Sequence, residues 1–366
     1  MAGKCMHFPG ERMGDGWLAF GSWGWWLGIG SCELECKFRQ SGTDKIPVVG
    51  PFLKWVGGKR QLLDQLRAWY PKTFRRYIEP FVGSGAVFFD LHNSGAFAEG
   101  DRRAWLVDDN PDLVGCYEMV RDRTEQVITA LMRLEAGHRA RGDAHYYEIR
   151  DERFNPDRAA GAPYSPGLAA MLIYLNRTGF NGLFRLNRRG EFNVPAGRYT
   201  NPRICDAERL RAVAAVLRHP RVVIECGSFE RPLAAAGPGD FVYCDPPYAP
   251  LSRTSSFASY TARGFSADDQ ARLQRAVIDA VTRGACVIVS NSDAPVIRRL
   301  YTAPEARGAG LSVAPVMARR SINSAANLRG PITELVATNV RAGRASVPLR
   351  MLRAGDALRR RQSRPA

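Results

Sequence analysis

The architecture of the chain is set by residues 77–85, which read Tyr77-Ile78-Glu79-Pro80-Phe81-Val82-Gly83-Ser84-Gly85. The first three of these residues favour a short strand, and Pro80 ends it. Gly83 and Gly85 then form a turn, and residues 86–91 open a helix. Glycines between a strand and a helix let a ligand approach the backbone closely. The stretch therefore predicts one strand of an α/β sheet with a ligand site at its end.

A carboxylate follows the next predicted strand, Trp105-Leu106-Val107, because Asp108 stands directly after it. An acid at this distance, roughly 20 residues beyond the glycine turn, typically accepts hydrogen bonds from ribose hydroxyls. A dinucleotide site would need a third glycine at position 88, where this chain has Phe88. We therefore expect a nucleoside ligand without a pyrophosphate group. A tight turn that binds nothing is the alternative.

Apolar strands alternate with helical patterns along most of the remaining chain. Pro111 suits the first turn of a helix that runs through Leu113 and Tyr117. Strands as apolar as these are covered on both faces, which favours a mostly parallel α/β sheet. Further strands are expected at residues 222–224, 241–244, 287–289 and 332–340, and further helices at 118–134, 207–217 and 268–281.

The alternation of strands and helices breaks between residues 116 and 203. Alternating apolar and polar residues flank a turn near Arg189-Gly190 within residues 176–194, which indicates a β-hairpin. Six arginines and a single acid, Glu191, lie between residues 177 and 203. A two-stranded ribbon fits the major groove of B-DNA, where Arg and Asn pair with base edges. We therefore predict an inserted DNA-recognition domain, helical at first, that carries a basic hairpin.

The charge balance favours a polyanionic partner. The 52 Lys and Arg residues exceed the 36 Asp and Glu residues, which gives a net charge of +16 and a pI of about 9.9. Lys and Arg neutralise phosphates and release counterions, although an excess of charge also keeps a protein soluble. We expect a poorly ordered N-terminal extension (1–45), a catalytic domain (46–115 and 204–340), the insertion (116–203) and a disordered Arg-rich tail (341–366).

Cysteines and apolar runs argue against a secreted or membrane protein. Several of the eight cysteines lie inside apolar runs, as Cys244 and Cys286 do, which is typical of buried thiols in a reducing compartment. Cys32 and Cys36 form the only close pair, and no nearby histidine completes a zinc site. No stretch has the roughly 18 apolar residues of a membrane span, and the N-terminal run lacks the basic flank of a signal peptide. We expect a cytoplasmic protein.

A second chemistry-bearing segment, Asp245-Pro246-Pro247-Tyr248, follows the strand predicted at residues 241–244. Its prolines stiffen a turn at the carboxyl end of a strand, where open α/β sheets bind ligands. The Asp245 carboxylate and the Pro246 carbonyl can each accept one N–H of an exocyclic amine such as adenine N6. That frees the nitrogen lone pair for a methyl group from a sulfonium donor, which needs no metal. Tyr248 offers a face for an extruded base. A Pro-rich loop with a solvated Asp is the alternative.

A third segment, residues 52–60, reads Phe52-Leu53-Lys54-Trp55-Val56-Gly57-Gly58-Lys59-Arg60. Its two glycines permit close approach of a ligand to the backbone. Trp55 suits the covering of an adenine ring, and Lys59 suits an ion pair with a carboxylate. By itself the segment is equally compatible with a loop that carries a partly buried Trp.

In this order the segments resemble the motifs of the Dam family of DNA adenine-N6 methyltransferases over about residues 50–340. The resemblance rests on residues 52–59, 79–85, 108–113, 174–199 and 245–251, with Arg319-Arg320-Ser321-Ile322 and Glu334-Leu335. It implies a Rossmann-like methyltransferase sheet with an inserted helical and β-hairpin DNA-recognition domain. It also implies S-adenosylmethionine as methyl donor, adenine in GATC of double-stranded DNA as target, and a monomer without a metal.

The resemblance also assigns roles to individual residues. Catalysis falls to the Asp245-Pro246-Pro247-Tyr248 segment, with Asp245, Pro246 and Tyr248 as its working parts. The cofactor-binding positions are Trp55, Lys59, Gly83, Gly85, Asp108 and Asp245. The positions that read or hold DNA are Lys54, Leu183, Arg185, Asn187 and Arg198. Residues 1–45 and the Arg-rich tail have no counterpart in the family.

Other activities fit the sequence less well. A cytosine-C5 methyltransferase uses a nucleophilic Cys, usually after Pro, and the chain has no Pro-Cys pair. Enzymes that methylate RNA adenine or a protein amide use a related loop in which Asn commonly replaces Asp245, and cytosine-N4 enzymes more often carry Ser there. A nicotinamide dehydrogenase would need the third glycine. A binding-only relative would be expected to lose Asp245 or Gly83. Methylation of RNA adenine or of another exocyclic amine stays as the alternative.

Overall fold

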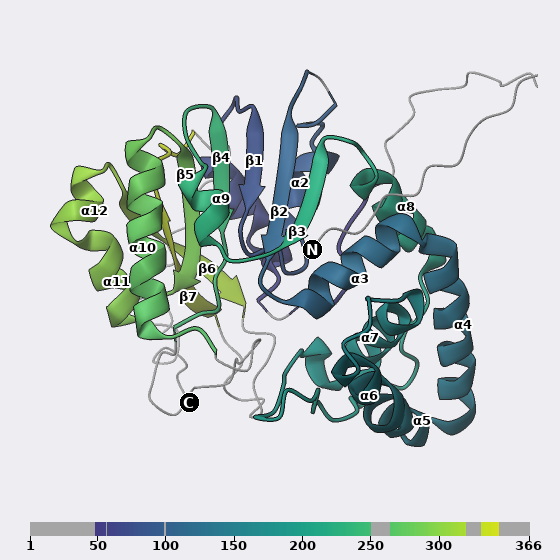
Figure 1. Cartoon of the computed structure of the whole chain (residues 1–366). Coiled ribbons are helices and arrows are strands. Elements are labelled where there is room, and N and C mark those ends of the chain that lie inside the picture. Colours follow the sequence, from purple (N-terminus) through teal and green to yellow (C-terminus); the bar gives the residue numbers. More distant parts are fainter. Residues whose placement is uncertain (1–47, 56, 99, 250–263, 320–330, 344–366) are drawn as a thin grey trace, which may run out of the picture. The chain divides into compact units, whose positions relative to one another are not determined.

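A sheet of seven strands, in the order β3-β2-β1-β4-β5-β7-β6, crosses the described part of the chain (Figure 1). The computed structural model describes residues 48–55, 57–98, 100–249, 264–319 and 331–343. The strands are β1 (Arg76–Glu79), β2 (Arg103–Asp108), β3 (Val222–Cys226), β4 (Asp240–Cys244), β5 (Cys286–Ser292), β6 (Ser312–Arg319) and β7 (Pro331–Thr338). β1 to β5 pair in parallel, whereas β7 is antiparallel to β5 and β6. The predicted mostly parallel α/β sheet is confirmed.

The order of the strands reverses between β1 and β4, since the chain builds β2 and β3 on one side of β1 and later strands on the other. Such a switch point opens a crevice at the carboxyl ends of the strands, where α/β proteins bind ligands. The residues after β1, β2 and β4 are the ones that the sequence singles out. The predictions for residues 1–45, for Arg320-Ser321-Ile322 and for nearly all of the Arg-rich tail fall outside the described residues.

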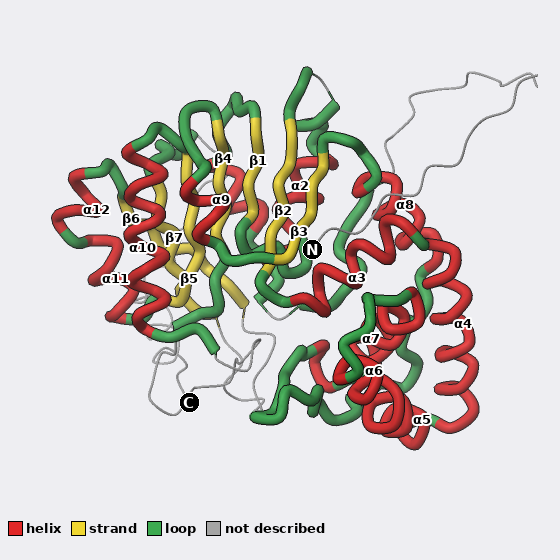
Figure 2. The backbone as a smooth tube through the Cα atoms, viewed as in Figure 1, coloured by secondary structure: helices red, strands yellow, loops and turns green. Residues whose placement is uncertain are grey.

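Side chains along the strands alternate between two cores. On one face, Tyr77 and Phe241 pack with α1 (Leu63–Leu66), α2 (Ala86–Asn93) and α8 (Ala207–Leu217). On the other face, Ile78 and Val242 pack with α9 (Glu230–Ala234), α10 (Ala267–Thr282) and α11 (Pro295–Thr302). Helices thus flank the central strands on both sides, as Figure 2 shows in red and yellow. Cover on both faces is what allows these strands to be apolar throughout.

The prediction of cover on both faces is wrong for β3. Val223 is 48% exposed, because β3 is the edge strand of the sheet and Val223 lines an open hollow beside Trp105 and Arg231. The other edge strand, β6, was not predicted from its pattern. It contains Pro315, which a strand tolerates at an edge, where the missing N–H leaves no gap in a ladder.

One predicted helix is two helices in the structure. The pattern predicts helical structure over residues 118–134 and shows no break, but α3 (Pro111–Asp122) ends at Asp122 and α4 (Thr124–Arg141) begins after Arg123. Arg123 has φ −129° and ψ 36°, which is outside the helical region. The apolar spacing runs on across this break, so periodicity could not reveal it. The predicted helices that follow strands β1 and β2 are confirmed, and Asn110 caps α3 ahead of Pro111.

The insertion is mainly helical. After α4 come α5 (Asp143–Glu148), a π-helix η3 (Ile149–Phe154), α6 (Asn155–Ala159), α7 (Pro166–Thr178) and the short 3-10 helix η4 (Phe180–Gly182). The predicted hairpin follows as two antiparallel arms that are joined by isolated bridges, Gly179 with Ala196 and Leu186 with Phe192, rather than by continuous strands. Among the described residues, no helix has the length and apolar content that crossing a membrane would require.

Candidate active site

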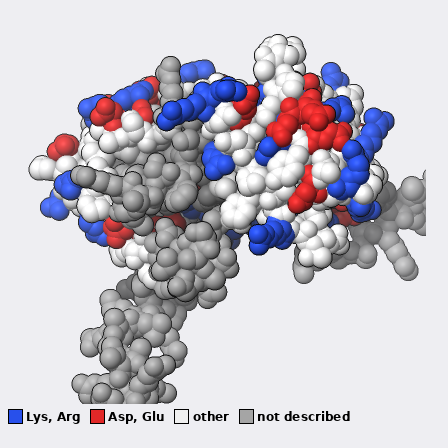
Figure 3. All heavy atoms as spheres, turned by 90° about the horizontal axis from the view of Figure 1, so that it is seen from below, with Lys and Arg blue, Asp and Glu red and all other residues white. Residues whose placement is uncertain are grey.

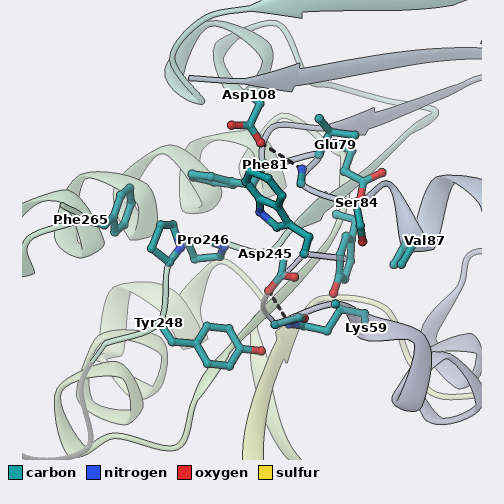
Figure 4. A pocket seen from close by; sticks show the side chains of 18 of the residues that line it. Lys59, Glu79, Phe81, Ser84, Val87, Asp108, Asp245, Pro246, Tyr248 and Phe265 are labelled. Atoms are coloured by element: carbon teal, nitrogen blue, oxygen red, sulfur yellow. Dashed lines mark hydrogen bonds and ion pairs between the residues drawn. The ribbon is translucent and has the colours of Figure 1, made fainter. Parts of the chain in front are cut away.

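A pocket of about 200 Å³ lies at the carboxyl ends of β1, β2 and β4 (Figure 4). It brings together residues from segments that lie far apart in the chain, among them the 55–59 loop, the glycine turn after β1, Asp108 at the end of β2 and the Asp245 segment after β4. Asp108 lies at one end of the pocket and Tyr248 at the other, with Asp245 between them. The cofactor and catalytic residues predicted from sequence thus meet in one place, apart from Gly85, which lies in the turn beneath.

The glycine turn has the conformation that its sequence predicts. Gly83 has φ +47° and Gly85 has φ +66°, and both values favour glycine. A Cβ on Gly83 would lie 2.9 Å from Cδ1 of Trp55, so any side chain there would collide with the indole. The Gly83 carbonyl accepts a hydrogen bond from the Tyr117 hydroxyl at 3.1 Å. The turn is therefore held on one side by Tyr117 of α3, and its other side faces Trp55.

Asp108 is held by two backbone amides. The Gly83 N–H donates to its Oδ2 at 3.0 Å, and the Asn110 N–H donates to its Oδ1 at 3.1 Å. The side chain of Asn110 in turn caps α3, so the carboxylate stands at a helix start of fixed geometry. Burial raises the pKa of Asp108 to about 7, although the two amides favour the charged form. Such a group changes its charge near neutral pH.

Lys59 pairs with Asp245 at the centre of the pocket. The Lys59 Nζ lies 2.8 Å from Oδ1 of Asp245, and it also donates to the Gly57 carbonyl at 2.6 Å. Lys59 is only 4% exposed, whereas the Asp245 side chain is 20% exposed and opens into the pocket. Burial raises the pKa of Asp245 to about 6, against the opposing pull of Lys59. The lysine is the cation that keeps this buried acid ionised near neutral pH.

Tyr248 is positioned from two sides. Its ring lies under the Lys59 ammonium, with Nζ 4.6 Å from the ring centroid. Its hydroxyl donates to Oε2 of Glu334 on β7 at 2.5 Å. The ring therefore stands as a fixed wall next to Asp245. The sequence pointed to Glu334 only as part of a resemblance, and no local signal showed that it holds Tyr248.

A buried pair of amides supports the Asp245 segment from behind. Gln270 of α10 donates to the Pro247 carbonyl at 2.9 Å and accepts from Nδ2 of Asn291 at 3.0 Å. Asn291 of β5 accepts in turn from the Ala249 N–H at 3.3 Å. Both amides are at most 2% exposed. Sequence reasoning missed these residues, because nothing in a helical or strand pattern marks a polar residue as support for a distant loop.

Glu79 is a third acid of the pocket that the prediction did not assign. It ends β1, is 2% exposed, and accepts a hydrogen bond from the Tyr77 hydroxyl at 2.9 Å. Burial raises its pKa well above the ordinary value. Its position at the end of the strand in residues 77–85, shortly before the glycine turn, was the signal that could have identified it. With Asp108 and Asp245 it makes the pocket a site rich in carboxyl groups.

The residues predicted to bind DNA lie in and beside the hairpin. Lys54 packs against Gly182, and its Nζ lies 4.1 Å from the ring centroid of Tyr199. The neighbouring Trp55 stacks on Phe184 at 5.8 Å, which connects the pocket wall to the recognition segment. Leu183 is partly buried and Arg198 is exposed. Seen from below, Lys and Arg side chains are spread over the described surface, while acids gather mainly on the side of the insertion (Figure 3).

Two of the predicted DNA readers bond to the hairpin itself. Arg185 donates from Nε to the Asn193 side chain at 2.8 Å and from Nη2 to the Asn193 carbonyl at 3.2 Å. Asn187 closes the turn, because its Oδ1 accepts from the amides of Arg189 and Glu191 at 2.8 and 3.0 Å. Neither side chain extends freely into solvent in this structure.

Comparison with known proteins shows the family of this chain. The family model of D12 class N6 adenine-specific DNA methyltransferases matches residues 55–316, and the chain belongs to that family. It is an adenine-specific DNA methyltransferase whose methyl donor is S-adenosylmethionine, as the sequence predicted.

The match to several named relatives covers nearly the whole length of each relative. A type II methyltransferase, M1.LlaDCHI of Lactococcus lactis subsp. cremoris, is 37% identical over 79% of this chain and 95% of its own. The DNA adenine methylase of Escherichia coli (strain K12) is 37% identical over 78% of this chain and 94% of its own. The type II methyltransferase M.MjaIII of Methanocaldococcus jannaschii is 38% identical over 75% and 93%. A solved rRNA methyltransferase from Streptomyces viridochromogenes aligns with 76% of this chain and 82% of its own at 18% identity and a TM-score of 0.28, from which we draw nothing.

Proposed function

We propose that this enzyme methylates N6 of an adenine that is swung out of duplex DNA, and that its target is GATC. The observation that carries the proposal is the pairing of Lys59 with Asp245 beside Tyr248, at the end of a pocket whose other end is Asp108. The pocket thus has one end suited to a ribose and another suited to a flat base. A base still inside a duplex could not reach it, which is why extrusion is part of the proposal.

The residues present fit the methyl donor. The glycine turn has no Cβ that would fill the pocket, and Asp108 offers a carboxylate where ribose hydroxyls would donate. The carboxylate of Asp245, together with that of Asp108 above its pKa of about 7, gives the pocket acceptors that suit a cationic ligand. When bound, S-adenosylmethionine supplies a methyl group on a positively charged sulfur. We assign Trp55, Lys59, Gly83, Gly85, Asp108 and Asp245 to its binding.

Asp245, Pro246 and Tyr248 are the residues to which we assign the chemistry. Lys59 bonds to Oδ1 of Asp245, and we assign the second carboxylate oxygen to one N6–H of the adenine. The Pro246 carbonyl takes the other N6–H, so the nitrogen lone pair is turned out of the ring system. Tyr248 stacks against the base. The N6–C bond forms as the S–C bond breaks, and N6 then loses one proton to solvent.

We propose that the insertion reads the target. Lys54, Leu183, Arg185, Asn187 and Arg198 are the residues to which we assign reading or holding of the duplex. The basic hairpin, with its six arginines between residues 177 and 203, supports this role. The target GATC is carried over from the resemblance of this hairpin to Dam-type enzymes. The division into a catalytic domain (46–115 and 204–340) and a recognition insertion (116–203) belongs to the same proposal.

The test is methylation of DNA that lacks adenine methylation. Purified enzyme is incubated with the methyl donor and the DNA, which is then digested with two nucleases, one blocked by methylated GATC and one that requires it. We expect resistance to the first nuclease and cleavage by the second. Methyl incorporation without either change would disprove the target but not the chemistry. A parallel RNA substrate tests the alternative, and transfer to RNA alone would overturn the assignment to DNA.

A further inference from the structure

Four side chains of the insertion hold the second arm of the hairpin by its backbone. The Tyr146 hydroxyl and Nη1 of Arg150 both donate to the Val194 carbonyl at 2.9 Å. Asn155 donates to the Phe192 carbonyl at 3.0 Å and accepts from the Phe192 N–H at 2.8 Å. Nη1 of Arg158 donates to the Gly190 carbonyl at 2.8 Å. We call Tyr146, Arg150, Asn155 and Arg158 the donor row.

The donor row matches the period of an extended chain. Alternate residues of a strand present their carbonyls to the same side, and the row bonds to every second carbonyl from residue 190 to 194. Arg150 lies in the π-helix η3 (Ile149–Phe154), and Asn155 begins α6 directly after it. Residues five apart face the same side in a π-helix but not in an α-helix, and such turns often occur at functional sites. The row therefore sets the register of the arm much as a neighbouring strand would.

Arg158 differs from the other members because it also reaches the catalytic side. Its Nε lies 2.8 and 2.9 Å from the two oxygens of Asp112, and its Nη2 lies 2.7 Å from Oδ2. Arg158 is 14% exposed and Asp112 is 8% exposed, so the pair is largely shielded from water. Asp112 lies in the first turn of α3, whose cap, Asn110, also donates its N–H to Asp108.

One guanidinium therefore joins the tip of the hairpin to the helix start beside the ribose acid (Figure 1 shows α3 and α6). We infer that Arg158 is a positioning residue that couples occupancy of the cofactor pocket to target choice by the hairpin. The inference rests on the proposed role of the hairpin. A planar guanidinium with a fixed fork is suited to this, because it bonds a carboxylate and a carbonyl in one rigid arrangement. A cofactor that orders Asp108 and the start of α3 thereby favours one placement of Gly190.

Arg158→Lys tests the inference, with Arg150→Lys as its matched control. Lysine keeps a positive charge beside Asp112 but loses the fork. Both variants weaken one bond to a hairpin carbonyl, while only Arg158 contacts Asp112. Two quantities are measured for each: the ratio of kcat/KM on GATC duplex to that on duplexes changed at one base, and amide hydrogen exchange at residues 187–194 with and without S-adenosylhomocysteine.

We expect Arg158→Lys to reduce the discrimination ratio about tenfold, a typical size for coupling between two sites. It should also abolish the slowing of exchange at residues 187–194 that the ligand causes in the wild type. Arg150→Lys should keep both within about twofold, because the Tyr146 hydroxyl still donates to the same Val194 carbonyl and keeps the register there. A variant Arg158→Lys that lowers activity equally on all duplexes, and keeps the exchange response, would show a merely structural role and overturn the inference.

The experiment also covers a variant that does not fold and a wild-type enzyme that does not methylate duplex DNA. If circular dichroism shows that Arg158→Lys is not folded, Asp112→Asn replaces it, because that change weakens the same contact from the other partner by removing the negative charge and one of the two acceptor oxygens. If the wild type does not methylate duplex DNA, the proposed function fails, yet the exchange experiment still decides whether Arg158 connects the cofactor pocket to residues 187–194. A ligand response that is absent in the wild type would sink the coupling even where methylation succeeds.

Discussion

The pocket and the recognition hairpin hold their polar side chains in opposite ways. In the pocket, bonds join segments that lie far apart in the chain, as between Lys59 and Asp245 or between Gly83 and Asp108. In the hairpin, Arg185 and Asn187 bond to residues eight and four positions away. The geometry of the pocket is thus imposed by the whole fold, whereas these two side chains are held by the hairpin that carries them.

This difference assigns different tasks to the two regions. A buried, fold-imposed arrangement is already organised for one reaction, because its groups need no rearrangement when charge develops. A side chain held by local hydrogen bonds at a surface can exchange those bonds for base edges at little net cost. Substitutions in the pocket should therefore abolish methyl transfer, whereas substitutions in the hairpin should change which DNA sequence is preferred. Four predictions can break or sharpen that contrast.

The largest effect is expected from Asp245→Ala. In the proposed mechanism this carboxylate accepts the first N6–H, and its loss also leaves Lys59 without the acid with which it pairs at the centre of the pocket. We expect kcat to fall by about a thousandfold or more, as for groups that act directly on the reacting atoms. DNA affinity, measured by fluorescence anisotropy without cofactor, should stay within about twofold, because the substitution leaves the side chains assigned to holding the duplex intact. Methyl transfer is followed by incorporation of labelled methyl groups.

The control is Asp101→Ala, which removes an exposed acid that does not line this pocket. That variant should retain the wild-type rate. Normal turnover by Asp245→Ala would refute its catalytic role, and loss of DNA binding together with turnover would mean that the pocket and the hairpin are not separable.

A smaller effect is expected at Asp108, and it depends on pH. Burial raises the pKa of this acid to about 7, so in the free enzyme it is protonated below that pH and ionised above it. If the ionised form binds the ribose, cofactor affinity should fall about tenfold for each pH unit below 7. Asp108→Asn should weaken binding about a hundredfold at pH 8, the size expected for lost hydrogen bonds to a charged group. It should also flatten the pH dependence.

Calorimetric titration with S-adenosylhomocysteine between pH 5.5 and 8.5 measures both properties. Asp101→Asn is the control, since that acid is exposed and does not line the pocket. A dissociation constant that rises equally steeply below pH 7 in the Asn variant would assign the titration to another group. A flat wild-type profile would show that the ribose does not need the ionised form.

In the hairpin, Arg185→Ala should change which DNA sequence the enzyme prefers rather than the rate of methyl transfer. The variant frees Asn193 and removes a guanidinium that can pair with a guanine. We expect the preference for GATC over sites changed at one base to drop about tenfold, which is typical of one lost base contact. Affinity for the cofactor should not change. The measurement compares kcat/KM on a set of short duplexes.

Arg188→Ala serves as the matched change in the same turn, because Arg188 is exposed. It should weaken binding to all duplexes alike, as loss of a phosphate contact does. If Arg185→Ala keeps the site preference of the wild type, Arg185 does not read the DNA sequence, and the hairpin serves only as a scaffold.

The same contrast explains what the sequence could predict. The short motifs around Gly83, Asp108 and Asp245 each combine a strand end with a chemistry-bearing residue, so a local pattern locates them on the same edge of a sheet. The family and the methyl donor followed from those motifs and are confirmed. The roles of single residues remain predictions, because no comparison tests them.

What the sequence could not predict depends on contacts between distant segments. Gln270 lies in a helix whose apolar spacing was identified correctly, yet its bond to the Pro247 carbonyl has no local signal. The same is true of Arg158, which belongs to no motif and bonds to Asp112 and to the Gly190 carbonyl, both far from it in the chain. The break at Arg123 was missed because the apolar pattern continues across it. Periodicity reports which face is buried, not which polar group a buried side chain will meet.

The smallest effect is expected from removing residues 344–366, which contain seven arginines and one aspartate. The cut leaves Gly343, whose N–H donates to the Ala68 carbonyl at 2.8 Å, so the body of the catalytic unit should keep its contacts. If the tail acts only by attracting phosphates, DNA affinity should fall about threefold at physiological salt, and the salt slope should lose about 1 to 3 counterions. Site preference and kcat should not move. Neutralising the seven arginines with Gln should reproduce the deletion, because charge alone is responsible. A deletion that alters target choice would show that the tail, like the hairpin, takes part in selecting the target sequence.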